Sequence, residues 1–248
     1  MIETDIGGHV GTITLNRPES HNALDQAAMQ ALHERLQDWS SRDDIRVLVL
    51  TGAGKSFCAG ASLGELAGKD WTENPLTTLC SALDAFPVPT ICAMNGGAFG
   101  GGVELAMACD FRVGVEGMTA FVPPARLGIH YEPAGIARVV ERLGSQAARR
   151  MFLLAETFDA AALKEIGFLD RLVAPQELDA EAMNIAGTIA GLAPLAVRGM
   201  KRTIREIGAG TLDTVAARKR IAACFASEDL QEGLAAMKEK RAPVFKGR

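Results

Sequence analysis

The chain has 248 residues, of which 48% are hydrophobic and 23% are charged. This composition is typical of one globular protein, long enough to bury a core and too short for two large domains. The 26 lysines and arginines against 30 aspartates and glutamates give a formal net charge of −4. Basic residues are nowhere dense enough to attract a nucleic-acid backbone, so nucleic acid is excluded as an expected partner.

The chain shows no sign of secretion or of a membrane span. Its first residues, MIETDIGGHV, lack the basic and then apolar pattern of a signal peptide, and no stretch approaches the roughly 18 uninterrupted apolar residues of a transmembrane helix. The five cysteines form no C-x-x-C pair, so neither a disulfide framework nor a zinc site is indicated. We therefore expect a cytoplasmic protein with no metal and no membrane partner.

Strands and helices alternate along the first half of the chain. The alternating, β-branched segment His9–Asn16 predicts a strand, and Asp25–Trp39, with apolar residues at spacings of three and four, predicts a helix. The apolar run Ile45–Leu50 predicts a buried strand. The same order recurs in the expected helix Trp71–Phe86 and the expected strand Val88–Met94. This alternation predicts an α/β core.

The C-terminal part of the chain is almost entirely helical by pattern. Phe168–Val173 predicts one short strand, and Gln176–Lys240 predicts helices only. Pro194 suits a first helical turn, so we expect a core over residues 1–192 and a helical oligomerisation region over residues 193–248. One small core cannot cover all the apolar positions of this region, which are Leu192, Leu195, Val197, Met200, Leu212, Val215, Ile221 and Phe225.

The segment Asn95–Asp110, NGGAFGGGVELAMACD, is the most informative stretch of the chain. Five glycines in eight residues allow a close approach of the backbone, and Val103–Cys109 can then begin a helix whose first amides have no intrahelical partner. An amide near Gly101 and the carboxylate of Glu104, three residues later, then lie on the same side of the first turn. The alternative is that the glycines only permit tight packing and that Glu104 caps the helix.

A second glycine-rich loop, Gly52–Gly64, follows the other buried strand and invites three interpretations. It resembles the end of a phosphate-binding loop, but the first glycine of that motif would fall at Val49, inside the strand. It also contains a G-x-S-x-G pattern around Ser62, which suggests a serine hydrolase in which only His130 follows as a base. In the third interpretation Ala59–Ala61 present backbone amides to a ligand, and with Gly101 they form an oxyanion hole.

These segments together carry a family resemblance. Thr12–Leu24, Val49–Ala61, Val88–Asp110 and Ser227–Arg248 resemble, in the same order, the signature stretches of the crotonase (enoyl-CoA hydratase/isomerase) superfamily. The resemblance implies an α/β fold, a crotonase-like spiral of ββα repeats with a C-terminal helical trimerisation region. It also implies an acyl-CoA substrate, with coenzyme A as part of the substrate and no separate cofactor, and a homotrimer or homohexamer.

The same resemblance assigns roles to individual residues. The amides of Ala61 and Gly101 match the oxyanion hole that holds the thioester carbonyl, and Glu104 matches one of two acidic residues with which hydratases of the family activate water. Ala59 is expected to contact the substrate. Lys240 matches a basic position through which a neighbouring subunit reaches the phosphates of coenzyme A in relatives.

The second acidic residue of the family's hydratases is missing. Pro124 or Ala125 stands where that glutamate would be. The run LGIHYEPAGI resembles methylmalonyl-CoA decarboxylases, which place a tyrosine at the position of Tyr131, although those enzymes carry a histidine where this chain has Ala61. Tyr131 and the nearby Glu132 are therefore candidate catalytic residues.

We expect an enzyme that stabilises an enolate. Hydration, double-bond migration and decarboxylation of an acyl thioester all place negative charge on the carbonyl oxygen, and two fixed donors lower the barrier most when that charge is greatest. The expectation is a lyase or isomerase of fatty acid metabolism resembling enoyl-CoA hydratase. The alternatives are a methylmalonyl-CoA decarboxylase-like activity, a serine hydrolase using Ser62, and a non-catalytic acyl-CoA-binding relative.

Overall fold

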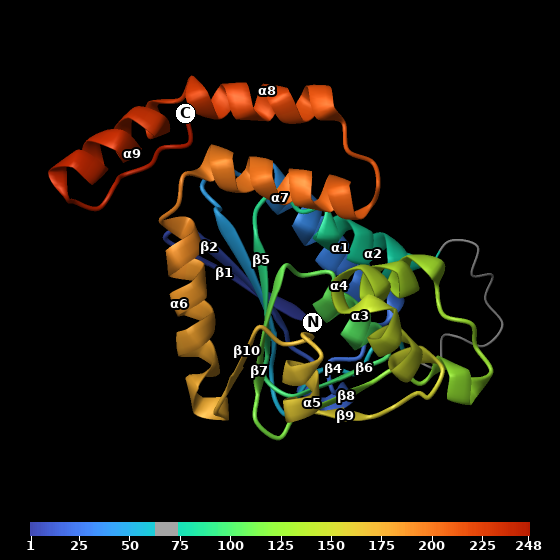
Figure 1. Cartoon of the computed structure of the whole chain (residues 1–248). Helices are drawn as coiled ribbons and strands as arrows, with labels where there is room; N and C mark the ends of the chain where they lie inside the picture. The colour runs from blue at the N-terminus through green and yellow to red at the C-terminus, as the bar shows by residue number, and fades with distance from the viewer. Residues whose placement is uncertain (63–73) are drawn as a thin grey trace.

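Two β-sheets organise residues 1–62 and 74–248, the part of the chain that the computed structural model describes (Figure 1). The longer sheet has the order β1(Ile2–Gly7), β2(Val10–Leu15), β3(Val47–Gly52), β5(Thr90–Met94), β7(Phe111–Val115) and β10(Arg171–Val173). The shorter sheet has the order β4(Ser56–Cys58), β6(Gly97–Phe99), β8(Thr119–Phe121) and β9(Phe158–Asp159). All neighbours pair in parallel except β1 with β2 and β8 with β9.

The chain winds through these sheets as a spiral. Each turn places one strand in the longer sheet, the next strand in the shorter sheet and then a helix: β3, β4 and α2(Pro75–Asp84), followed by β5, β6 and α3(Gly101–Met107). The strands β7 and β8 repeat the pattern before the 3-10 helix Pro124–Leu127 and α4(Pro133–Phe152). This arrangement confirms the α/β spiral of ββα repeats.

The first helix and the central strands form where the sequence predicts them. Helix α1(Gln26–Ser40) begins after Asp25, whose carboxylate accepts a hydrogen bond from the amide of Ala28 at 2.8 Å. Its predicted apolar face is buried against the core, and β3 and β5 are fully or almost fully buried. The helix predicted over Trp71–Phe86 begins at Pro75, after the N-cap Asn74, and residues 71–73 lie outside the described part of the chain.

The remaining helices follow the last strand of the spiral. Helix α5(Ala160–Glu165) precedes β10, and a 3-10 turn, Pro175–Glu177, leads into α6(Leu178–Ala190), which packs against the longer sheet. Helices α7(Pro194–Gly208), α8(Thr214–Phe225) and α9(Glu228–Glu239) then extend beyond the sheets (Figure 1). Helix α7 begins at Pro194, as predicted, and the division into residues 1–192 and 193–248 stays a prediction.

Helix lengths bear on the question of a membrane span. No single helix within the described ranges is long and apolar enough to cross a membrane. The helical segments Pro175–Ala190 and Pro194–Gly208 together have the length and apolar composition of a span, but the chain bends by 107° between them.

Candidate active site

Two backbone amides lie close together where the spiral brings its loops side by side. Gly101 is the first residue of α3, so its amide has no intrahelical acceptor. Ala61 forms an isolated parallel bridge with Leu24, in which Leu24 donates to Gly60 at 2.8 Å and Ser62 donates to Leu24 at 3.0 Å. Because these bonds use the residues that flank Ala61, the amide of Ala61 itself points to the other side.

The glycines of this region make the approach possible. A Cβ built on Gly101 would lie 3.2 Å from the nitrogen of Ala61, and a Cβ built on Gly60 would lie 2.7 Å from the nitrogen of Gly101. Gly60 also has a φ of +84°, which side chains rarely adopt. No acceptor for the amides of Ala61 and Gly101 is present among residues 1–62 and 74–248. The pair can therefore donate together to one oxygen atom of a ligand.

The amide of Ala59 does not face a ligand, contrary to expectation. It donates to the carbonyl of His21 at 2.9 Å, and the amide of Gly60 faces the sulfur of Cys58 at 3.4 Å. Of the three consecutive amides predicted to bind a ligand, only that of Ala61 is available. A contact between another atom of Ala59 and the substrate stays a prediction.

Glu104 lies in the first turn of α3 and is only 4% exposed. Its side chain does not cap the helix. Instead its Oε1 accepts a hydrogen bond from Nη1 of Arg138 at 3.4 Å. Burial raises the pKa of Glu104 above its ordinary range, while the Tyr131 hydroxyl and the charge of Arg138 lower it and the charge of Glu132 raises it further. A buried carboxylate of this kind is suited to accept and return a proton.

Tyr131 lies directly beside Glu104. A Cβ built on Gly135 would lie 2.6 Å from Cε1 of Tyr131 and 3.0 Å from Oε2 of Glu104, so the two side chains meet at this glycine. The Tyr131 hydroxyl also lies 3.4 Å from the carbonyl of Gly100, and its ring packs on Phe152 with centroids 5.0 Å apart. Burial raises the pKa of Tyr131 well above its ordinary range, so the phenol stays a neutral donor.

Glu132 occupies the N-cap position of α4 but makes no side-chain cap. Its Oε1 accepts a hydrogen bond of 3.3 Å from Nδ2 of Asn74, the residue that caps α2. Glu132 is half-buried, and its charge acts on the pKa of Glu104. The structure thus brings Glu132 near the site, in a hydrogen bond with another helix end.

Two other predicted residues lie apart from this group. A ring nitrogen of His130 lies 2.7 Å from the carbonyl of its neighbour Tyr131, and within the described part of the chain it makes no hydrogen bond to Ser62. Lys240 is exposed at the C-terminal end of α9, a helix that extends beyond the sheets, whereas α3 is buried (Figure 1). A role of Lys240 toward a neighbouring subunit stays a prediction.

Sequence reasoning missed a set of charged residues behind Glu104. Arg138 lies within 4.0 Å of Asp84, and Asp84 accepts a hydrogen bond of 2.7 Å from Arg142. Arg142 in turn donates to the carbonyls of Met107 and Cys109 at the end of α3. The available signal was the spacing of three and four between Gly135, Arg138 and Arg142, which places them on one face of α4.

Comparisons with known proteins agree with one another. Residues 5–248 match the family model described as "Enoyl-CoA hydratase/isomerase". The chain is 36% identical over 242 residues to the 2,3-dehydroadipyl-CoA hydratase of Escherichia coli strain K12, covering 95% of this chain and 94% of that protein. The crystal structure of an enoyl-CoA hydratase from Bacillus anthracis matches with a TM-score of 0.92 and 33% identity, covering 100% of this chain and 99% of the other. The crystal structure of an enoyl-CoA hydratase/carnithine racemase from Magnetospirillum magneticum matches with a TM-score of 0.93 and 30% identity, covering 100% of this chain and 96% of the other.

Proposed function

The chain belongs to the enoyl-CoA hydratase/isomerase family, whose members act on acyl-CoA, and we propose that it transforms its substrate through an enolate. The observation that carries this proposal is the placement of two unengaged amides, those of Ala61 and Gly101, together with the buried Glu104. Two donors and one proton carrier are the groups that enolate chemistry at a thioester requires.

The two amides stabilise the negative oxygen. In the ground state the thioester carbonyl accepts their hydrogen bonds, and in the transition state the same oxygen carries the developing charge. Each donor of this kind is worth about 3 to 4 kcal/mol of activation free energy. Because both amides are held by the backbone, they need little reorganisation during the reaction.

Glu104 moves the proton. In hydration its carboxylate removes a proton from water while the water oxygen bonds to the β-carbon, and the electrons of the double bond pass to the thioester oxygen. The carboxylic acid then returns the proton to the α-carbon. In double-bond migration the same carboxylate takes a proton from one carbon of the acyl chain and returns it to another. Neither route needs a second carboxylate as a proton carrier, which fits Pro124 or Ala125 at the position of the missing acid.

Tyr131 favours a second candidate, the decarboxylation of a malonyl-type thioester. Its neutral hydroxyl lies beside Glu104 and Gly100, where it can donate to a carboxylate carried by the substrate. Loss of carbon dioxide leaves the electrons of the broken bond in the enolate, which the two amides stabilise equally well. A proton from water then bonds to the α-carbon and gives the product. We place this activity second, behind hydration or isomerisation.

A turnover screen separates these candidates. The purified protein is incubated with enoyl-, malonyl- and methylmalonyl-CoA, and the products are identified by mass spectrometry. Hydration or isomerisation of enoyl esters supports the first candidate, and turnover of malonyl-type esters alone supports the second. Tight binding of all esters without turnover would contradict both and leave a non-catalytic binder. Inactivation by a serine-directed phosphonate would favour a hydrolase.

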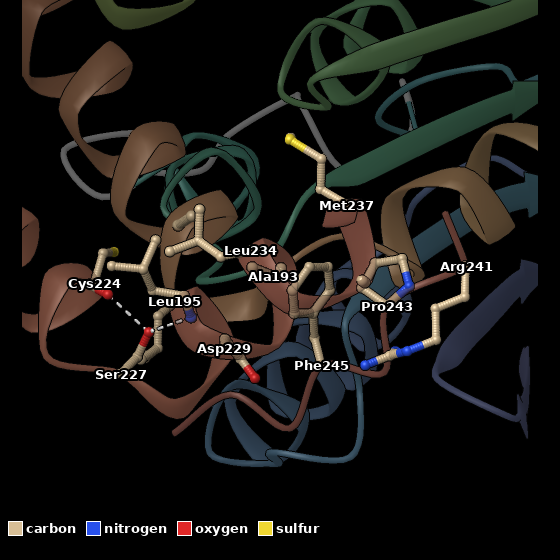
Figure 2. A pocket seen from close by; sticks show the side chains of 14 residues that line it. Ala193, Leu195, Cys224, Ser227, Asp229, Leu234, Met237, Arg241, Pro243 and Phe245 are labelled. Atoms are coloured by element: carbon tan, nitrogen blue, oxygen red, sulfur yellow. Dashed lines mark hydrogen bonds between the residues drawn. The ribbon is translucent and has the colours of Figure 1, made fainter. Parts of the chain in front are cut away.

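We further propose that the protein is a homotrimer or a dimer of trimers. Helices α7 to α9 expose large apolar side chains, among them Ile204, Phe225 and Met237, each about 70% exposed or more. A groove of about 510 Å³ between these helices is lined by further apolar residues, including Leu195, Leu234 and Phe245 (Figure 2). Light scattering at micromolar concentration is expected to give a trimer or hexamer, and a monodisperse monomer would refute the proposal.

We also propose that the protein is cytoplasmic and acts in fatty acid metabolism. All five cysteines are free thiols, and four of them are buried, which suits a reducing compartment. Fractionation of cells that carry a tagged chain, with assay of each fraction on fatty acyl-CoA esters, tests both statements. Activity confined to a membrane or secreted fraction would contradict the location.

A further inference from the structure

Four charged side chains form a row of alternating sign behind the proposed site. Arg138 on α4 lies 3.4 Å from Glu104 on α3 and 4.0 Å from Asp84 on α2, and Arg142 lies 2.7 Å from Asp84. The side chains of Glu104 and Arg138 are 3% and 8% exposed, and those of Asp84 and Arg142 are 21% exposed. The row therefore links three helices through the interior.

The charge of this row depends on Glu104. The charges of the two carboxylates and the two guanidinium groups sum to zero only when Glu104 is ionised. A proton on Glu104 would leave a net positive charge on largely buried groups, which is costly in an environment of low polarity. The row thus opposes the effect of burial, which by itself would neutralise Glu104.

The other groups that face Glu104 do not share this role. Tyr131 and Glu132, at the start of α4, supply a neutral phenol and a negative charge. Cys80 on α2 is a buried thiol whose pKa is raised well above its ordinary range, so it carries no charge. Arg138 lies 3.4 Å from Glu104, and its positive charge lowers the pKa of Glu104.

We propose that Arg138 is a positioning residue that holds Glu104 in its ionised form and in one orientation, an inference that rests on the proposed role of Glu104 as the proton carrier. The guanidinium binds Oε1, while Oε2 lies toward Gly135 and Tyr131 and is the oxygen that exchanges the proton with the substrate. Asp84 fixes the guanidinium from the other side.

Arg142 completes the arrangement by joining α4 to the end of α3. Its guanidinium bonds to the carbonyls of Met107 and Cys109, which lie at the C-terminal end of the helix that carries Glu104. The same guanidinium also donates a hydrogen bond to Oδ1 of Asp84. The spacing between Glu104 and Arg138 is therefore supported by contacts at both helices.

The test measures the titration of Glu104 directly. Protein labelled with ¹³C at the glutamate carboxyl groups is titrated by NMR without substrate, and the Glu104 signal is assigned from its loss in Glu104→Gln. We expect the pKa of Glu104 to rise by about 1 to 3 units in Arg138→Gln, the usual effect of losing a close opposite charge, and by less in Arg138→Lys. Arg150→Gln is the matched control, because Arg150 lies on the same helix and pairs with Glu156. It is expected to leave the titration unchanged.

The outcomes separate this inference from the proposed function. An unchanged Glu104 titration in Arg138→Gln overturns the role of Arg138, whether or not the protein turns over acyl-CoA. If Arg138→Gln does not fold, an unchanged titration in Arg138→Lys overturns it instead. A shifted titration in a protein that turns over no acyl-CoA supports the role of Arg138 and refutes the role of Glu104 as a proton carrier. In an active enzyme, the pH profile of kcat/KM is expected to shift with the titration.

Discussion

Adding one methyl group at Gly60 should lower catalytic activity by more than the accompanying loss of stability explains. In Gly60→Ala the new Cβ would lie 2.5 Å from the carbonyl oxygen of Phe99 and 2.7 Å from the nitrogen of Gly101. Both contacts are with backbone, so the loop that carries Ala61 must move away from α3. The two amides then no longer converge on one oxygen atom.

The magnitude follows from two separate effects. A φ of +84° costs an alanine about 1 to 2 kcal/mol of stability, and the crowding adds about 1 to 3 kcal/mol. Displacing one donor of an oxyanion hole lowers kcat about 10²- to 10³-fold. Gly117→Ala is the matched control, because Gly117 has a φ of +78° and nothing within 4 Å of the built Cβ. Gly117→Ala therefore introduces the same kind of backbone strain without any steric contact of the new methyl group.

Thermal unfolding and kcat are measured for wild type, Gly60→Ala and Gly117→Ala on the acyl-CoA that wild type turns over fastest. Both variants should lose stability, but only Gly60→Ala should lose kcat. Equal kcat in the two variants would refute the assignment of the oxyanion hole. If Gly60→Ala does not fold, Gly101→Ala disturbs the same pair of amides, since its Cβ meets the end of the Leu76 side chain at 2.6 Å and the nitrogen of Ala61 at 3.2 Å. An unaltered kcat in Gly101→Ala would then count against the assignment.

Four further predictions concern single side chains. Glu104→Gln keeps the size of the side chain and removes its basicity, so it should nearly abolish kcat and change acyl-CoA binding only severalfold; an unchanged kcat would return Glu104 to a structural role. In wild type, kcat/KM should rise with pH through an apparent pKa above the ordinary 4.5, because burial raises the pKa of Glu104. Ser62→Ala should leave activity nearly unchanged, and complete loss in the same assay would revive the hydrolase alternative. Tyr131→Phe should raise the activation free energy for malonyl-type esters by about 1 to 3 kcal/mol and scarcely alter turnover of enoyl esters. Glu132→Gln should suppress hydration only if Glu132 relays a proton. Malonyl-type turnover that falls in Tyr131→Phe and survives in Glu132→Gln would make decarboxylation the main activity. Asp229→Ala should loosen the C-terminal tail by about 1.5 to 3 kcal/mol, because the buried carboxylate accepts bonds of 2.7 and 2.8 Å from the amides of residues 246 and 247, and unaltered hydrogen exchange of these two amides would contradict this.

The long elements of the fold could be predicted because each carries its own pattern. The helix after Asp25 shows an apolar face and an N-cap, and β3 and β5 are continuous apolar runs. The strands of the shorter sheet have only two or three residues each, too few for a period to be visible. Strand β1 was missed because three of the six residues in its sequence, IETDIG, are polar, and because most of the strand is exposed at the sheet edge.

The part of the candidate site that could be predicted is the part that local backbone structure determines. A run of glycines before a helix indicates free amides and a carboxylate on the first turn, which led to Gly101 and Glu104. The engaged amide of Ala59 depends on a distant turn in which His21 and Asn22 both have a positive φ, and no local pattern reveals that contact. The spacing of Arg138 from Arg142 indicates a shared helix face, but it does not reveal the partners of Arg138, which lie on other helices.

Hydrogen exchange at the substrate's α-carbon reports formation of the enolate directly. A saturated acyl-CoA is incubated with the protein in deuterated water, and deuterium at the α-carbon is measured by NMR and mass spectrometry. Exchange requires an enolate and a proton carrier but neither hydration nor loss of carbon dioxide. We predict enzyme-dependent exchange in wild type that is lost in Glu104→Gln and greatly slowed in Gly60→Ala. Binding of the acyl-CoA without exchange in wild type, or equal exchange in Glu104→Gln, would contradict it.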